Sequence, residues 1–367
     1  MKLLAITTFV LLTGGLFWKK NVEAAAAPID KRPKNIILMI GDGMGLSQIS
    51  AGFYHNGWKF NLEKFPVVGF QKTYSANNLV TDSAAGATAM ACGKKTNNNV
   101  LGLTPDGQSC ESILEEASHN GLATGMVVTS SIQHATPGGF VAHREARNLY
   151  EDITLDLLDS GIDFFVGGGK QYFERREKDD INLVLALKAK GFDVYDYFNH
   201  ELSQIKPDPS HKLAFFTADN QPLSAFQGRD YLPAAAKLAT NYLENRNDQG
   251  FFLMIEGSQI DWTCHANQVE PLYSEMADFD KTIEQVLQFA RKNGETLVIV
   301  TADHETGGLG LNGSTARMLA PKFTTNGHTA AMVPVFAFGP QSGLFRGIYE
   351  NTEIHHKMRT AFGFSEN

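Results

Sequence analysis

Cysteine is scarce in this chain, with only three among 367 residues: Cys92, Cys110 and Cys264. No two of them have the CxxC spacing, so a zinc site here would have to use histidine and carboxylate ligands. An odd number leaves at least one thiol unpaired within the chain. A Cys92–Cys110 disulfide is possible in an oxidising compartment, and the sequence leaves open whether it forms.

Long apolar segments are also scarce, and the main one lies at the N-terminus. Residues 1–24 have the pattern of a signal peptide: Lys2, an apolar run to Trp18, and small residues around Ala24 for cleavage. The alternative is a membrane anchor, which a short run interrupted by two glycines disfavours. No later segment is long and apolar enough to cross a membrane. We therefore expect residues 25–367 to be one exported domain, periplasmic or secreted, with no membrane attachment.

Positive charge is in deficit. The net charge is −8, and residues 1–24 hold three lysines and one glutamate, so their removal lowers it to −10. Such a charge disfavours binding to nucleic acid or to anionic membranes, which requires a basic face. A phosphate ligand would need local cations, and bound metal ions would supply them.

Proline is sparse relative to glycine, with 13 prolines and 34 glycines. Few prolines and many glycines make loops less constrained. Cold adaptation is therefore a hypothesis for this protein.

Short apolar runs alternate with helical patterns along the chain. This alternation predicts an α/β fold with a large, mostly parallel central sheet between helices, and with loop insertions. Expected strands span 35–40, 122–129, 162–168, 192–197, 251–257, 296–305 and 334–340. Expected helices span 109–120, 181–191, 231–245 and 270–292. No internal repeat or low-complexity linker is evident, and the long weakly periodic segment 306–333 is expected to be a functional loop.

Acidic residues lie at or just beyond the C-terminal ends of three expected strands. Asp42 comes after NIILMIG, Glu256 after FFLMI, and Asp303 after TLVIVTA. Ligands of open α/β sheets bind outside the carboxyl ends of the strands. Each acid alone could be a loop cap or an ion-pair partner, but three together indicate a site at one sheet edge, since a buried carboxylate needs a partner.

Histidines lie beside these acids. His265 follows Asp261 by four residues, His304 is adjacent to Asp303, and His328 lies in the long loop. Each histidine alone is typical of an ordinary surface or core position. Together with carboxylates, they favour Zn²⁺ for the histidine-containing sets and Mg²⁺ for an all-oxygen set.

Two small-residue motifs accompany the acids. In VTDSAAGATA, Ser83 follows Asp82 at the start of an expected helix, where it either caps the helix or presents free N–H groups to a phosphate. GDGMG at 41–45 has neither the Walker lysine nor the dinucleotide glycine spacing. We interpret its glycines as permitting a tight turn that directs Asp42 inward.

With these motifs in order, the chain resembles the alkaline phosphatases from about Asn35 to the C-terminus. The motifs are GDGMG, TDSAAGATA, HATPGGFVAH with Arg147, EGSQID with His265, TADHE and NGHTA. Several independent motifs in the family's order make the resemblance specific. It implies a metal-dependent phosphomonoester hydrolase, usually a homodimer, that acts on small phosphomonoesters and binds inorganic phosphate.

The resemblance also implies a role for each matching residue. Ser83 would be the nucleophile that becomes phosphoserine, and Arg147 would bind two phosphate oxygens. One zinc would be held by Asp42, Asp303 and His304, and this zinc would activate Ser83. A second zinc would be held by Asp261, His265 and His328. One magnesium would be held by Asp42, Thr136 and Glu256, with Asp42 shared between sites.

This residue set suits phosphoryl transfer. A serine hydroxyl is a weak nucleophile near neutral pH, and a bound zinc lowers its pKa without a histidine base. An arginine offers the fork geometry that phosphate oxygens favour. The positive charge of the three ions would also offset the negative charge of the chain locally.

At two positions the chain departs from some relatives, which carry an acid at His134 and a lysine at Trp262. Both differences remove charge close to the expected magnesium and phosphate positions. We expect weaker magnesium binding as a result, while the zinc ligands are intact.

The same residues disfavour three alternative functions. A sulfatase would need a modifiable residue in a signature that TDSAAGATA lacks. A phosphodiesterase would usually have threonine at the nucleophile and lack Arg147. A non-catalytic metal-binding protein would need neither Ser83 nor Arg147.

Overall fold

A ten-stranded sheet runs through the middle of the molecule in the computed structural model, which describes residues 31–315 and 318–365. The predicted signal peptide, residues 1–24, lies outside this part of the chain. The strand order is β14-β2-β13-β8-β1-β7-β3-β4-β6-β5. All neighbouring pairs are parallel except the two that β13 makes with β2 and β8. The prediction of a large, mostly parallel sheet is confirmed.

The strands of this sheet are short to medium in length. In chain order they are β1 (Asn35–Gly41), β2 (Val67–Lys72), β3 (Ala123–Ser131), β4 (Phe164–Gly168), β5 (Phe192–Asp196), β6 (Lys212–Phe216), β7 (Phe251–Gly257), β8 (Thr296–Thr301), β13 (Val333–Phe338) and β14 (Gly347–Glu350). The sequence had not revealed β2, β6 or β14.

Strand β1 shows why the sheet is central. Its side chains alternate between the two faces, and both faces are apolar: Ile36 and Leu38 pack into one core, whereas Ile37 and Met39 pack into the other. All four are fully buried. A continuous apolar run is what a parallel strand covered by helices on both faces requires.

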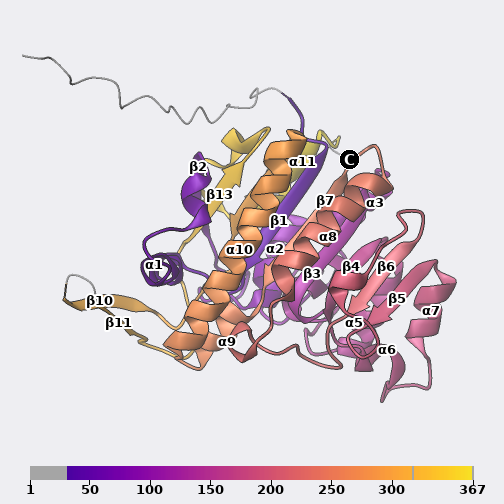
Figure 1. The fold of residues 1–367 in the computed structure, drawn as a ribbon, viewed down its shortest axis with the longest axis horizontal. Coiled ribbons are helices and arrows are strands. Elements are labelled where there is room, and N and C mark those ends of the chain that lie inside the picture. The colour runs from indigo at the N-terminus through magenta and orange to yellow at the C-terminus, as the bar shows by residue number, and fades with distance from the viewer. Residues whose placement is uncertain (1–30, 316–317, 366–367) are drawn as a thin grey trace, which may run out of the picture.

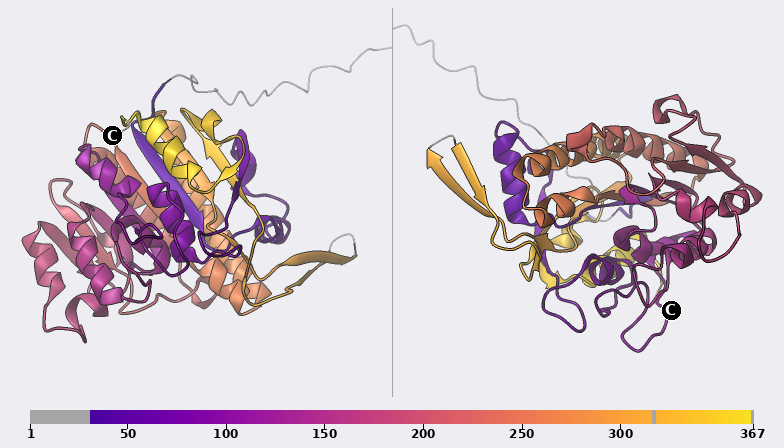
Figure 2. Two further views of the ribbon diagram at one scale, coloured as in Figure 1. Left: turned by 180° about the vertical axis from the view of Figure 1, so that it is seen from behind. Right: turned by 90° about the horizontal axis from the view of Figure 1, so that it is seen from below.

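Helices cover both faces of the sheet. In Figure 1, α8 (Tyr231–Arg246) and α10 (Val269–Asn293) cross in front of the strands, and α1 (Leu46–His55) lies on the same side. Figure 2 shows the opposite face, where α2 (Ser83–Cys92), α3 (Ile113–His119) and α11 (Glu353–Phe362) pack. The remaining α-helices of the described residues are α4 (Ala135–Val141), α5 (Tyr150–Asp159), α6 (Gln171–Glu174), α7 (Leu183–Ala189) and α9 (Gln259–His265).

The segment 306–333, which was expected to be a loop, contains regular secondary structure. It contains an antiparallel hairpin, β10 (Gly310–Thr315) and β11 (Met318–Lys322), that projects from the body of the molecule (Figures 1 and 2). It also contains β12 (His328–Thr329), which pairs with β9 (Glu305–Thr306). These strands are hard to predict because only a few of their side chains, such as Leu311 and Leu319, pack against the core.

Several expected boundaries shift by a few residues. The strand expected at 296–305 ends at Thr301, because the chain then turns so that Asp303 and His304 enter the site. The helix expected from 109 begins at Ile113, after Ser112 caps it and Glu115 completes a capping box. The helix expected from 181 begins at Leu183, because Asn182 accepts the N–H of Leu185.

Candidate active site and metal centre

Three neighbouring strands bring carboxylates to one edge of the sheet. β1 lies between β7 and β8, with Ile40 beside Glu256 on one side and beside Thr301 on the other. Asp42 follows β1, and Asp303 follows β8. All three carboxylates are fully or almost fully buried. The expected convergence of acids at the carboxyl ends of the strands is therefore present.

The first group of side chains contains Asp42, Asp303 and His304. The Nε2 atom of His304 lies 3.1 Å from Oδ2 of Asp303 and 3.5 Å from Oδ1 of Asp42. Oδ1 of Asp303 accepts the N–H of Gly43 at 3.1 Å. Gly43 has φ 69°, and a Cβ there would lie 2.7 Å from Oγ1 of Thr306, so glycine is needed for this turn.

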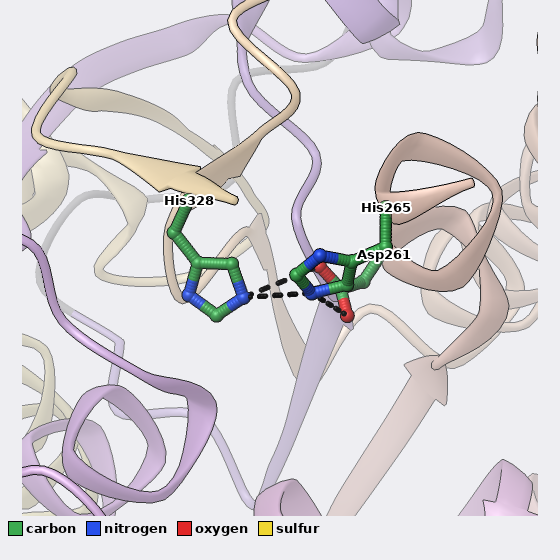
Figure 3. A group of neighbouring side chains, drawn as sticks. All are labelled: Asp261, His265 and His328. Atoms are coloured by element: carbon green, nitrogen blue, oxygen red, sulfur yellow. Dashed lines mark hydrogen bonds and ion pairs between the residues drawn. The ribbon is translucent and has the colours of Figure 1, made fainter. Parts of the chain in front are cut away.

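The second group, drawn in Figure 3, contains Asp261, His265 and His328. Nε2 of His265 lies 3.2 Å from Oδ2 of Asp261 and 3.0 Å from Nε2 of His328. The other ring nitrogens face backbone carbonyls: Nδ1 of His265 faces Asn326 at 2.6 Å, and Nδ1 of His328 faces Thr81 at 2.8 Å. The Nε2 atoms are thereby turned toward Asp261, as metal ligands would be.

The third group adds Glu256 and Thr136 to Asp42. Oε2 of Glu256 accepts the hydroxyl of Ser258 at 2.6 Å, which leaves Oε1 free. Thr136 lies in the first turn of α4, fully buried. His134 also comes close enough to Asp42 and Glu256 to share a metal with them.

Several polar atoms of these groups are buried without a hydrogen-bond partner. They are both carboxylate oxygens of Asp42, Oδ2 of Asp303, Oε1 of Glu256, Oγ1 of Thr136 and Nδ1 of His134. A buried polar atom without a partner is costly, and a buried carboxylate without one more so. The residues therefore fit bound cations, with imidazole and carboxylate donors for zinc and oxygen donors for magnesium.

The pKa shifts of the buried carboxylates also indicate that this site binds cations. Burial, followed by repulsion from Asp303 and Asp261, raises the pKa of Asp42 well above its ordinary value. Burial raises the pKa of Glu256 to about 7. Cations at these positions would replace the lost solvation and favour the ionised carboxylates.

Ser83 is the first residue of α2. Its hydroxyl Oγ lies 3.3 Å from Nε2 of His304, and the side chain is almost fully buried. Asp82 caps the helix by accepting the N–H of Ala85 at 3.0 Å. Ser83 is thus not the capping residue, and its hydroxyl is free to face the first group.

Arg147 approaches the same helix end from the loop before α5. Its Nη1 lies 3.2 Å from Oδ2 of Asp82, and its backbone N–H donates to the carbonyl of Asn99 at 2.8 Å. The side chain keeps about a quarter of its surface exposed. The guanidinium therefore stands at the entrance to the site with further N–H groups available to an anion.

His134 and Trp262 contact each other edge to face, with ring centroids 5.6 Å apart. Burial, aided by the nearby charge of Arg147, lowers the pKa of His134 to about 3. This shift favours the neutral form of the His134 ring. Neither ring brings charge to the third group, as the sequence predicted.

Glu305 is the last residue of the TADHE motif, and the sequence alone indicates no role for it. Its carboxylate accepts Nε2 of Gln48 at 2.7 Å, the N–H groups of Gly308 and Leu309 at 3.2 Å each, and the hydroxyl of Thr329. Because β9 pairs with β12, Glu305 holds the strand that carries His328. In the sequence, the feature that could have indicated this role is the position of Glu305 directly after His304, a predicted metal ligand.

Comparison with known proteins gives a consistent match. The family model for alkaline phosphatase matches residues 33–326 and 320–364. The chain is 32% identical to alkaline phosphatase 4 of Bacillus subtilis, over 96% of this chain and 95% of that one. It is 44% identical to the solved alkaline phosphatase of the Antarctic bacterium TAB5, with a TM-score of 0.87 over 92% of this chain and 99% of that one. A histidine-to-aspartate variant of the TAB5 enzyme, described with magnesium bound in its M3 site, matches with 43% identity, the same TM-score and the same coverage.

Proposed function

Because the chain belongs to the alkaline phosphatase family and is a metal-dependent phosphomonoester hydrolase, we propose that it works through a phosphoserine formed on Ser83. The observation that carries this proposal is the position of Ser83. Its hydroxyl lies at the N-terminus of α2, within 3.3 Å of His304. An attacking hydroxyl at this point has both the ligand groups and the free helix N–H groups around it.

Two zinc ions and one magnesium ion would complete the site. Asp42, Asp303 and His304 would hold one zinc, and the residues drawn in Figure 3 would hold the other. Asp42, Thr136 and Glu256 would hold the magnesium. When bound, such ions lower the pKa of a coordinated hydroxyl and stabilise charge on the attacking and leaving oxygens.

The chain's own residues bind and orient the phosphate. Arg147 donates to two of its oxygens, while Asp82 restrains the guanidinium from the other side. Oγ of Ser83 attacks phosphorus, and the alcohol of the substrate leaves from the opposite face. Water then cleaves the phosphoserine and returns Ser83 to its hydroxyl form.

The decisive assay compares p-nitrophenyl phosphate with bis(p-nitrophenyl) phosphate. We expect turnover of the monoester to exceed that of the diester by orders of magnitude, and to be lost on chelation. Preferential cleavage of the diester would replace this proposal with a phosphodiesterase. Metal binding without cleavage of either would replace it with the non-catalytic alternative.

We further propose export and dimerisation. The resemblance to exported bacterial phosphatases supports a periplasmic or secreted homodimer, and no helix among the described residues is long and apolar enough to cross a membrane. Cell fractionation and light scattering test the two points separately. Cold adaptation stays a prediction from the glycine and proline content, tested by the temperature of half-inactivation.

A further inference from the structure

Cys92 and Cys110 meet on the face of the sheet that α2 covers. Cys92 is the last residue of α2, and the helix stops there because Gly93 takes a left-handed conformation. Cys110 lies just before α3. Both side chains are buried and belong to the same apolar core. Neither takes part in the phosphatase site.

The two cysteines are in direct contact. The thiol of Cys92 donates to the backbone carbonyl of Cys110 at 3.0 Å, although the residues are 18 positions apart in sequence. The two thiols also interact with each other, and this interaction lowers the pKa of Cys110 and raises that of Cys92. A disulfide requires Cβ atoms about 3.5–4.5 Å apart, and the contact of the Cys92 thiol with the Cys110 carbonyl places the two residues side by side.

A cationic side chain lies beside this pair. Nδ1 of His143 lies 2.8 Å from the carbonyl of Gly102, which also accepts the N–H of Cys110 at 2.9 Å. Nε2 of His143 lies 3.0 Å from Oε1 of Glu115, and this contact raises the pKa of His143 to about 9. A positive imidazolium stabilises a thiolate, which is the reactive form of cysteine.

The third cysteine has none of these features. Cys264 is completely buried in the core on the other face of the sheet. Burial raises the pKa of its thiol, and its polar neighbour is the amide of Gln48 at 3.8 Å. It therefore serves as an inert reference within the same chain.

We propose that Cys92 and Cys110 are an oxidation site that forms an intramolecular disulfide. The oxidant is a disulfide of the surrounding medium, of which oxidised glutathione is an example. The thiolate of Cys110 attacks one sulfur of the oxidant and releases one thiol. The thiolate of Cys92 then attacks the mixed disulfide and releases the second thiol. One S–S bond forms in the protein and one breaks in the oxidant, so two thiols of the protein are oxidised and two thiols of the oxidant appear.

The disulfide would link the two ends of the segment 93–109, which contacts the phosphate-binding residue Arg147. Within this segment, the N–H of Asn99 donates to Oδ2 of Asp82 at 3.0 Å, and its carbonyl accepts the N–H of Arg147. A cross-link between the end of α2 and Cys110 restricts this loop in the unfolded chain and holds its base in the folded one. The expected benefit is resistance to heat.

The test uses the full metal-loaded enzyme. It is incubated with oxidised glutathione, denatured in the presence of a thiol-blocking reagent so that buried thiols also react, and digested without reduction. We expect one blocked cysteine, Cys264, and one linked pair of peptides that contain Cys92 and Cys110. The oxidised enzyme should melt about 3–5 °C above the fully thiol form, with unchanged kcat at low temperature.

The variants Cys264→Ala and Cys92→Ala are the controls. Cys264→Ala should still form the linked pair, whereas Cys92→Ala should show no difference in melting temperature between the oxidising and reducing treatments. Three blocked cysteines after incubation, a pair that includes Cys264, or glutathione retained on Cys110 of the native chain would each overturn the proposal. Equal melting temperatures for the oxidised and thiol forms would overturn the stabilising role.

Discussion

One carboxylate connects the start of α2 to the arginine at the site entrance. Oδ2 of Asp82 lies 3.2 Å from Nη1 of Arg147, while Oδ1 of Asp82 accepts the N–H of Ala85 at 3.0 Å. The N-terminus of the helix that begins with Ser83 and the guanidinium are therefore held in a fixed relation. The positions of nucleophile and anion-binding group are set by a single side chain.

Arg147→Ala should weaken inhibition by phosphate and raise KM, with a smaller loss of kcat than any change at Ser83. Loss of one charge-assisted pair of hydrogen bonds corresponds to about 1.5–3 kcal/mol, or roughly 10–150-fold in affinity. Inhibition constants for phosphate provide the measurement. Arg144→Ala is the matched control, because Arg144 pairs with Asp156 instead of facing the site. Equal phosphate affinity in Arg147→Ala and the native enzyme would contradict the binding role.

Ser83→Ala should fold and keep its metals but lose turnover by at least about 10³-fold. The reason is that, in the proposed mechanism, the phosphoryl group is transferred to the hydroxyl of Ser83, the first residue of α2. Acid quenching of the native enzyme with a labelled monoester should leave the label on Ser83, as mass spectrometry of the digest would show. A labelled peptide from elsewhere in the chain would refute the assignment.

Glu305→Gln should lower zinc affinity without emptying the site at high zinc concentration. The change weakens the bonds from Gly308, Leu309 and Thr329 that hold the strand of His328. Outer contacts of this kind commonly alter metal affinity by about 10–100-fold. Zinc titration of activity after chelation gives the midpoint, and His328→Ala should lose one zinc that excess metal does not restore.

The control for Glu305→Gln is Asp280→Asn. Asp280 is also a buried carboxylate, it accepts the backbone N–H and side-chain amide of Asn61 at 2.6 and 2.7 Å, and it belongs to none of the three metal groups. This variant should lose stability but keep the native zinc midpoint. If both variants shifted the midpoint equally, the effect of Glu305 would be general destabilisation.

His134→Asp should bind magnesium more tightly than the native enzyme. His134 is neutral, with its pKa lowered to about 3 by burial, and it contributes no negative charge beside Asp42 and Glu256. A carboxylate at this position adds that charge. Activation by Mg²⁺ should therefore have its midpoint about 10–100-fold lower in the variant. Identical midpoints would show that His134 only fills space.

The stability of the protein should fall as the pH rises from about 6.5 to 9. His143 has its pKa raised to about 9 by its contact with Glu115. A group whose pKa is higher in the folded state stabilises the fold fully below its unfolded pKa, and this stabilisation is lost as the pH rises through the folded pKa. After allowance for partial exposure, the loss is about 1–2 kcal/mol.

Denaturant unfolding at several pH values checks this dependence. His143→Gln should remove this part of the slope. The control His119→Gln removes a more exposed histidine, paired with Glu111 at 2.5 Å, and shows how far loss of any histidine alters the slope. A slope that persists in His143→Gln would assign the dependence to another group.

The sequence by itself determined the central part of the fold. The apolar run of β1 requires burial on both faces, and α10 is amphipathic over its whole length and ends at Gly294 in a left-handed conformation. Such elements are predictable because their periodicity and end signals are local properties of the chain. The same local pattern placed Asp42, Glu256 and Asp303 after strands, and parallel strands bring such positions to one edge.

Only the tertiary structure decided the contacts between segments that are distant in sequence. The hairpin of β10 and β11, the double role of Asp82, the bonds to Glu305 and the meeting of Cys92 with Cys110 all depend on chain packing. Local sequence patterns do not predict these contacts. A hydrogen bond between distant segments depends on where both segments lie in the fold, whereas periodicity indicates only which face of an element a residue occupies. The pKa values of His134 and Glu256 also follow from burial by other segments, so they too belong to the folded molecule alone.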